Sequence, residues 1–136
     1  MRCSLVRPIL TIAVLASVGL ACGSSSDEGS GGGVAAGDVT IKVGAQNLGA
    51  GAFNPDTFTV SFATKQRVVF ANRDRTGGTY GGNGVVHHLV SDTIGIFDTG
   101  NIIAGQNSGI TFAAEGTYPY HCTIHATMKG VVILTP

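Results

Sequence analysis

The sequence lacks any excess of charge of one sign. Its 136 residues include 8 Lys and Arg against 8 Asp and Glu, and six basic residues face six acidic ones within 38–136. A protein that holds nucleic acid presents a basic patch or stripe to the phosphates, and no such field is available here. We therefore expect no nucleic-acid partner.

Long helical patterns are also missing. No amphipathic helix pattern and no internal repeat is present, and the glycine-rich stretch at 77–84 lacks the Lys and the helix that follow a phosphate-binding loop. Short segments instead alternate apolar with polar residues, as half-buried strands do; these segments are 39–43, 58–62 and 110–112. Many short strands separated by turn residues predict an all-β fold, an antiparallel sandwich or a barrel.

The longest apolar run is too short to cross a membrane comfortably. It extends from Ile9 to Ala21 after a basic start, whereas a spanning helix needs ~20 apolar residues. Such a run at the N-terminus predicts an export signal. Its end, Val18-Gly-Leu-Ala-Cys22, resembles a bacterial lipoprotein cleavage box, with Leu20 two residues before the cysteine instead of the usual three. We expect Cys22 to become a lipidated N-terminus, and ordinary cleavage that releases a soluble protein is the alternative.

The sequence thus divides into three parts. Residues 1–22 are predicted to be a signal peptide of the lipoprotein type, and residues 23–37 a flexible linker, because that stretch is rich in Gly and Ser. Residues 38–136 are then one domain of a size that can hold its own core. We expect an exported monomer in the bacterial periplasm or on the cell surface, tethered to the membrane through Cys22.

Cysteine is scarce in the predicted domain. Cys122 is the only cysteine in 38–136, so it has no disulfide partner there. An unpaired thiol in an oxidising compartment is open to oxidation unless something protects it. His125 and Met128 follow at intervals of three residues. Two sulfur ligands and an imidazole suit a metal that cycles between Cu(I) and Cu(II). The pattern favours metal ligation over a buried, inert cysteine.

The spacing requires a turn in this segment. Cys122 and His125 would lie about 10 Å apart on an extended strand, too far to share a metal. Tyr118, Tyr120 and Cys122 share one parity and are predicted to lie on one face at the end of a strand, as core aromatics and a ligand. Residues 124–129 would form a tight loop and 130–134 the next strand. His121 would point to the opposite face, away from the site.

A fourth ligand must come from elsewhere, and the remaining histidines are His87 and His88. Their neighbours are apolar on both sides, so strand alternation does not decide between them. With either one, the set becomes His…Cys-x-x-His-x-x-Met. Two histidines, one cysteine and a weak axial methionine mark a blue-copper electron-transfer site.

These residues resemble the cupredoxin family. The stretch 116–132 looks like the cupredoxin copper loop; it runs from Gly116-Thr-Tyr-Pro-Tyr-His-Cys to Met-Lys-Gly-Val-Val. Its two-residue gap between His125 and Met128 is similar to that of amicyanin, whereas plastocyanin and pseudoazurin have a longer gap. The family's upstream His-Asn-Val segment matches His88-Leu89-Val90 in its spacing from His to Val, which favours His88 over His87. Residues 53–60 and 68–72 resemble the family more loosely.

The resemblance implies a Greek-key β-sandwich with one type 1 copper ion. The implied ligands are His88, Cys122, His125 and Met128, and the implied function is single-electron transfer between redox protein partners, not enzyme catalysis. One position departs from the family: Leu89 stands where an Asn ties the two ligand-bearing segments together. Because contacts around the ligands tune the metal, the family's rigidity and redox potential do not carry over.

Other functions use the same residues differently. A copper carrier or storage protein would bind the metal in order to hand it on. A thiol enzyme would use Cys122 as nucleophile and His125 as base, which leaves Met128 without a role. A structural zinc site is disfavoured because Met is not among zinc's usual ligands.

Overall fold

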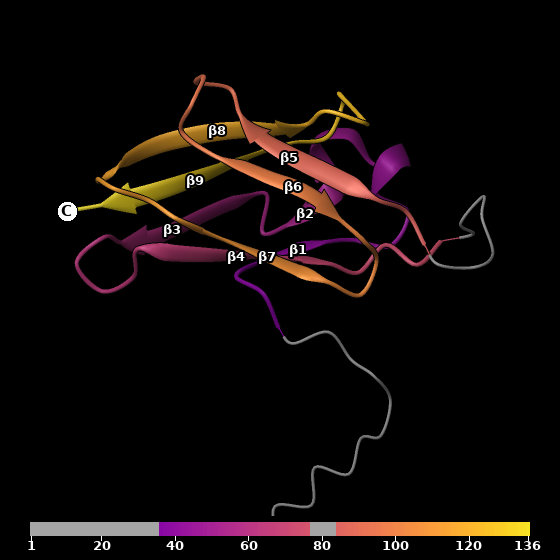
Figure 1. Ribbon diagram of the computed structural model, residues 1–136, viewed down its shortest axis with the longest axis horizontal. Helices are drawn as coiled ribbons and strands as arrows, with labels where there is room; N and C mark the ends of the chain where they lie inside the picture. The colour runs from indigo at the N-terminus through magenta and orange to yellow at the C-terminus, as the bar shows by residue number, and fades with distance from the viewer. Residues whose placement is uncertain (1–35, 77–83) are drawn as a thin grey trace, which may run out of the picture. The chain divides into compact units, whose positions relative to one another are not determined.

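The structure is a computed structural model that describes residues 36–76 and 84–136 (Figure 1). The predicted signal peptide at 1–22, most of the predicted linker and the lipidation site Cys22 lie outside the described residues, so these remain predictions. No helix in the described part is long and apolar enough to span a membrane.

Nine strands and two short 3₁₀ helices make up the described part. The helices are η1 (Ala45–Asn47) and η2 (Gly49–Ala52). The strands, in chain order, are β1 (Val39–Ile41), β2 (Phe53–Asn54), β3 (Thr57–Ser61), β4 (Arg67–Asn72), β5 (His87–Ser91), β6 (Asp98–Ile102), β7 (Asn107–Thr111), β8 (Gly116–Cys122) and β9 (Lys129–Thr135). The predicted all-β class is confirmed.

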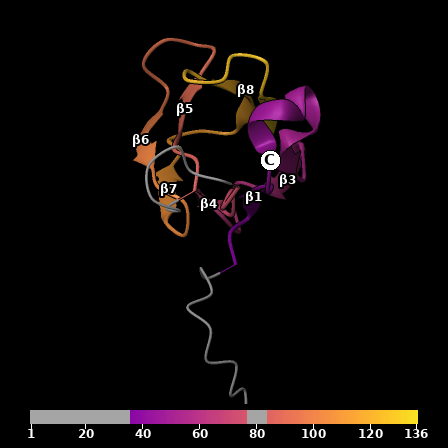
Figure 2. The same ribbon diagram turned by 90° about the vertical axis from the view of Figure 1, so that its right-hand side faces the viewer.

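The strands form two sheets that pack face to face. One has the order β2-β1-β4-β7 and the other β3-β9-β8-β5-β6, and Figure 2 shows β5 and β8 above β1 and β4. Most neighbours are antiparallel, as predicted, but β1 pairs with β4 and β3 with β9 in parallel. Sequence alternation does not distinguish these pairings, because it reports which face of a strand is buried and not the direction of its neighbour.

Aromatic side chains from both sheets fill the core. Tyr120 on β8 is fully buried, and its ring lies 5.0 Å from that of Phe53 and 5.3 Å from that of Phe70. Burying one such side chain contributes roughly 1.5–3 kcal/mol. Tyr118 packs at the edge of this core, 4.7 Å from Phe112. Both tyrosines are therefore core aromatics, as the sequence predicted.

Candidate metal centre

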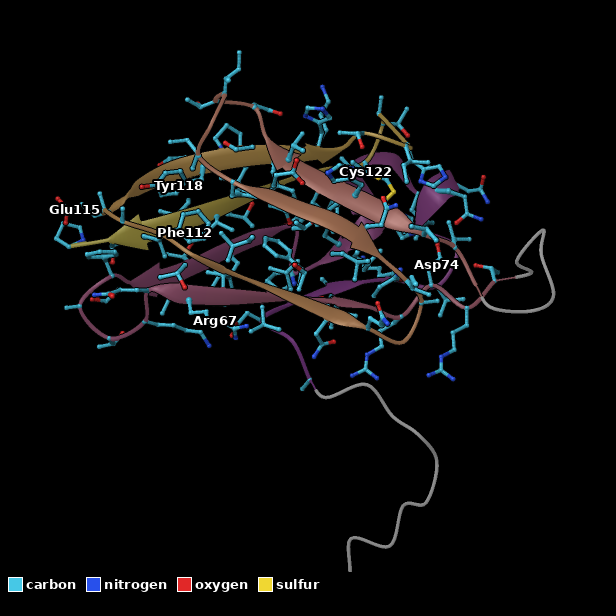
Figure 3. All side chains as sticks on the ribbon, viewed as in Figure 1. Arg67, Asp74, Phe112, Glu115, Tyr118 and Cys122 are labelled. Atoms are coloured by element: carbon cyan, nitrogen blue, oxygen red, sulfur yellow. The ribbon has the colours of Figure 1, made fainter. Side chains whose placement is uncertain are left out.

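Cys122 ends β8 with its side chain fully buried. It shares a face with Tyr120, because side chains two residues apart on a strand point the same way. Figure 3 shows Cys122 at the end of the sandwich opposite Glu115. It is the only cysteine in the described residues, and it is free. The thiol thus lies inside the protein at one end of the core.

The chain turns directly after Cys122, as its spacing to His125 required. Residues 123–128 form the connection to β9, which starts at Lys129. Two backbone hydrogen bonds close the turn: the Cys122 N–H donates to the Met128 carbonyl (3.1 Å) and the Met128 N–H to the His125 carbonyl (2.9 Å). The backbone therefore ties the three predicted ligand positions to one another before any metal binds.

The structure places His87, and not His88, beside Cys122. His87 is fully buried, and its Nδ1 lies 3.8 Å from Cys122 Sγ. His88 points to the outer face of the sheet and hydrogen-bonds Asp98 on β6. The prediction of His88 as the strand ligand is therefore wrong by one residue. The reason is register: Leu89 pairs with Cys122 across β5 and β8, so the residues of β5 that share the cysteine's face are His87, Leu89 and Ser91.

With this register, the position that follows the strand histidine is no longer Leu89, which we had expected to replace the family's Asn. The residue that follows the inward histidine is His88, and its carbonyl accepts hydrogen bonds from the Thr123 N–H (2.8 Å) and the Thr123 hydroxyl (3.3 Å). Thr123 directly follows Cys122. The two ligand-bearing segments are thus tied through the backbone of His88, and Leu89 is a buried core residue.

The three donor atoms have the separations that a metal ion needs. Cys122 Sγ lies 3.8 Å from His125 Nδ1 as well as from His87 Nδ1, and all three atoms lie within 4.8 Å of one another. With bond lengths like those of zinc, about 2.3 Å to sulfur and 2.0 Å to nitrogen at roughly 120°, a shared metal would separate S and N by about 3.7 Å. The two sulfur–nitrogen distances therefore fit a metal ion shared by these three residues.

Met128 is the fourth predicted ligand. Its side chain is fully buried in the same hydrophobic cluster as Cys122, and its backbone is hydrogen-bonded to the backbone of both Cys122 and His125. Soft sulfur from Met together with Cys thiolate and two imidazoles is the donor set of a copper site.

A carboxylate supports His87 from behind. The Nε2 atom of His87 lies 3.1 Å from Asp74 Oδ2, and both side chains are fully buried. Burial by itself raises the pKa of Asp74, but the hydrogen bonds from the Thr76 hydroxyl, the Gly44 N–H and His87 outweigh it, so the pKa of Asp74 falls below its ordinary 3.8. The pKa of His87 is also lowered, by burial first and by the nearby His125, against the raising effect of Asp74. An ionised carboxylate thus faces a neutral imidazole.

Sequence reasoning did not select Asp74. It lies 13 residues before His87, and no local spacing links the two. The available signal is its place two residues after the stretch 68–72, in a position where short polar side chains commonly bond neighbouring backbone groups. His121, in contrast, lies as predicted: it points outward and bonds Asp92.

Comparisons with known proteins identify the family of this fold. The family of cupredoxin-like domains matches residues 11–134. A purple cupredoxin from Nitrosopumilus maritimus is 22% identical with a TM-score of 0.59, over 71% of this chain and 97% of that chain. The copper-containing nitrite reductase NirK from Thermus scotoductus SA-01 is 27% identical with a TM-score of 0.55; the match covers 72% of this chain but only 22% of the reductase.

Amicyanin from Paracoccus versutus is 25% identical with a TM-score of 0.44, over 58% of this chain and 68% of that chain. No curated protein sequence matches the chain. The two-sheet sandwich, the cluster of buried His87 and Cys122 with partly exposed His125, and the family match over 11–134 lead to one conclusion. The chain belongs to the cupredoxin-like domain family.

Proposed function

We propose that this protein is a type 1 copper protein that carries single electrons between redox partners. The observation that carries the proposal is the set of donor atoms from His87, Cys122 and His125, within 4.8 Å of one another in a cupredoxin-like sandwich. Bound copper would supply a one-electron couple between Cu(I) and Cu(II) at this site.

The protein's own residues suit rapid electron transfer. Cys122 would bind copper as thiolate, His87 and His125 would bind it through imidazole nitrogens, and Met128 would add a soft thioether sulfur that favours the reduced ion. The ligands come from β5, from the end of β8 and from the loop closed by the bonds between Cys122, His125 and Met128. Because these elements hold the donors in place already, little rearrangement is needed between oxidation states.

His125 offers the route to a partner. It is partly exposed, while His87 and Cys122 are fully buried. Its neighbours in the loop are exposed, and Ile124 shows 51% of its surface. An apolar side chain beside the partly exposed His125 would add contact area for a docking partner. We propose that a redox protein docks over this loop and that the protein works as a monomer.

The burial of the thiol disfavours the enzyme alternative. Cys122 is 0% exposed, whereas a catalytic nucleophile needs access to its substrate. The similarity to a copper-containing nitrite reductase covers only 22% of that chain, and we do not extend that protein's activity to this one. A non-enzymatic role is therefore proposed.

An absorption spectrum tests the proposal. Copper(II) bound to the purified domain should give an intense visible band from thiolate-to-copper charge transfer, which disappears on reduction, returns on reoxidation and is missing in Cys122→Ser. A colourless copper complex would refute a type 1 site. A band that bleaches irreversibly, with copper passed on to a competing chelator, would favour the carrier or storage alternative.

We also propose that the protein is exported and held at the membrane through lipidated Cys22. The support is the sequence of residues 1–22 alone. Cells that express Cys22→Ala should lose the protein from their membrane fraction or accumulate an uncleaved precursor. If the parent and the variant are equally soluble, the protein is simply secreted.

A further inference from the structure

Asp74 is the only fully buried carboxylate among the described residues. It follows β4 and lies at the same end of the sandwich as Cys122 (Figure 3). A buried carboxylate is costly unless it is paired and hydrogen-bonded. Its contacts therefore show what holds it there and what it holds in turn.

Donors from two separate segments fix this carboxylate. Gly44 precedes η1 and Ala45 is its first residue; the backbone N–H of Gly44 donates to Oδ1 (2.8 Å) and that of Ala45 to Oδ2 (3.0 Å). The hydroxyl of Thr76 and its N–H (3.4 Å) also donate to Oδ1. The Asp74 N–H donates to Asn72 Oδ1 (2.9 Å). With both oxygens engaged, the carboxylate has a fixed orientation.

Asn72 extends the same network to the chain beside His87. Its side-chain amide donates to the carbonyls of Val85 and Ile102, both at 2.8 Å. Val85 lies just before β5, and Ile102 pairs with His87 across β5 and β6. The segment from Asn72 to Asp74 thus contacts both the backbone around His87 and the imidazole itself.

The hydrogen bond between His87 and Asp74 determines which ring nitrogen of His87 carries the proton. Backbone N–H groups donate to both oxygens of Asp74, so both oxygens act as acceptors, and the Nε2 atom of His87 that faces Oδ2 at 3.1 Å is the protonated one. In a neutral imidazole the other nitrogen then has a free lone pair. That nitrogen is Nδ1, which lies 3.8 Å from Cys122 Sγ.

We propose that Asp74 is a positioning residue for the copper site: it fixes the Nε2–H tautomer and the ring orientation of His87, so that Nδ1 is ready to bind the metal. A carboxylate behind a histidine ligand also raises the basicity of that ligand. The inference rests on the proposed function only in taking copper as the metal that Nδ1 receives. Within the described part of the chain no carboxylate hydrogen-bonds the imidazole of His125, so the two histidines would differ in rigidity.

The first experiment uses metal-free wild-type protein. Nitrogen NMR through two-bond couplings distinguishes the protonated from the bare ring nitrogen of each histidine, and His87→Gln assigns the signals. The proposal expects Nε2 of His87 to be protonated and Nδ1 to be bare. A proton on Nδ1, or rapid averaging between the two tautomers, would overturn it. No copper is involved, so this result is independent of the proposed function.

The second experiment removes the charge of Asp74 with little change in shape. Asp74→Asn should weaken copper(I) binding, measured against a competing chelator, by about 10–100-fold, and alter the visible band and its EPR hyperfine splitting. The matched control is Asp98→Asn, which removes an equal charge from an exposed carboxylate bonded to His88. It should leave copper affinity and band unchanged.

The outcomes separate the two proposals. If Asp74→Asn folds and binds copper as tightly as wild type with the same spectrum, Asp74 is a structural residue only and the inference fails. If Asp98→Asn weakens binding as much as Asp74→Asn, general charge and not positioning is responsible, and the inference also fails. If wild type itself shows no charge-transfer band, the proposed function fails whatever the tautomer of His87. If Asp74→Asn does not fold, the tautomer of His87 in the wild-type protein still decides whether the inference holds.

Discussion

At the scale of single residues, two adjacent histidines have opposite environments. His87 is fully buried beside Cys122, whereas His88 has a side chain that is 27% exposed and pairs with Asp98. Neighbouring strand residues point to opposite faces. One histidine therefore faces the candidate metal site, and the other lies on the outer surface of the sheet.

Substitution of each histidine tests this division. His87→Ala should abolish or transform the visible copper band, because it removes an inward donor, and added imidazole should partly restore it. His88→Ala should leave the band in place, because its side chain contacts Asp98 and not Cys122. The opposite result, measured on copper-loaded protein, would show that the β5 register is wrong.

The titration of Asp98 tests the contact between Asp98 and His88 on the outer face of the sheet. The pKa of its carboxyl is lowered from 3.8, first by the Gly100 N–H and then by His88. Because this pKa is lower in the folded than in the unfolded protein, the ionised carboxylate stabilises the fold at pH values above the unfolded-state pKa near 3.8. That stabilisation is lost as the pH falls through the folded-state pKa. Carboxyl NMR should therefore show Asp98 titrating below 3.8.

His88→Gln should move this midpoint only part of the way back, because the bond from Gly100 remains (2.7 Å). A complete return to the ordinary value would show that His88 and not Gly100 is the main cause.

At the scale of elements, the pairing of β8 with β9 holds residues 123–128 in place; we call this segment the ligand loop because it carries the candidate ligands His125 and Met128. Gly130 pairs with Tyr120 across these strands, and a methyl group at Gly130 would collide with the Tyr120 hydroxyl. That hydroxyl is buried without a hydrogen-bond partner among the described residues, and burial raises the pKa of Tyr120. The tight fit leaves no room for a larger residue where β9 begins.

Gly130→Ala should therefore destabilise the protein by about 1–3 kcal/mol, the usual cost of overpacking a core. Urea unfolding of the metal-free protein measures it. Gly51→Ala is the control, since a methyl group there meets nothing within 4 Å, and its effect should stay within about 0.5 kcal/mol. Equal stability of the two variants would mean that Tyr120 moves aside without cost.

At the scale of the whole molecule, a metal that bridges β5, β8 and the ligand loop should stabilise the fold. The donors lie on segments 35 residues apart in sequence. A ligand that binds the folded state alone adds about 2.7 kcal/mol when its free concentration is 100 times its dissociation constant. The site thus connects metal binding to the stability of the whole sandwich.

Removal of copper should accordingly lower the urea midpoint while the slope of the transition stays unchanged. Cys122→Ser should show a much smaller difference between its metal-treated and metal-free forms. An equal difference in wild type and variant would place the stabilising metal at another site.

The sequence by itself determined the local features. Cys122, His125 and Met128 lie within one seven-residue window, so their spacing alone required a turn and selected a copper-like donor set. Alternation assigned Tyr118, Tyr120 and Cys122 to one face of a strand and His121 to the other, because β8 has one buried and one more exposed face. Both features depend on neighbours along the chain.

Only the tertiary structure decided the long-range features. Apolar residues flank His87 and His88 on both sides, so alternation did not select a face, and the choice came from the pairing of Leu89 with Cys122 across two strands. Asp74 reaches His87 through the packing of the segment after β4 against the turn after β1 and against β5. Contacts between segments distant in sequence depend on strand pairing and sheet packing, which local residue patterns do not specify.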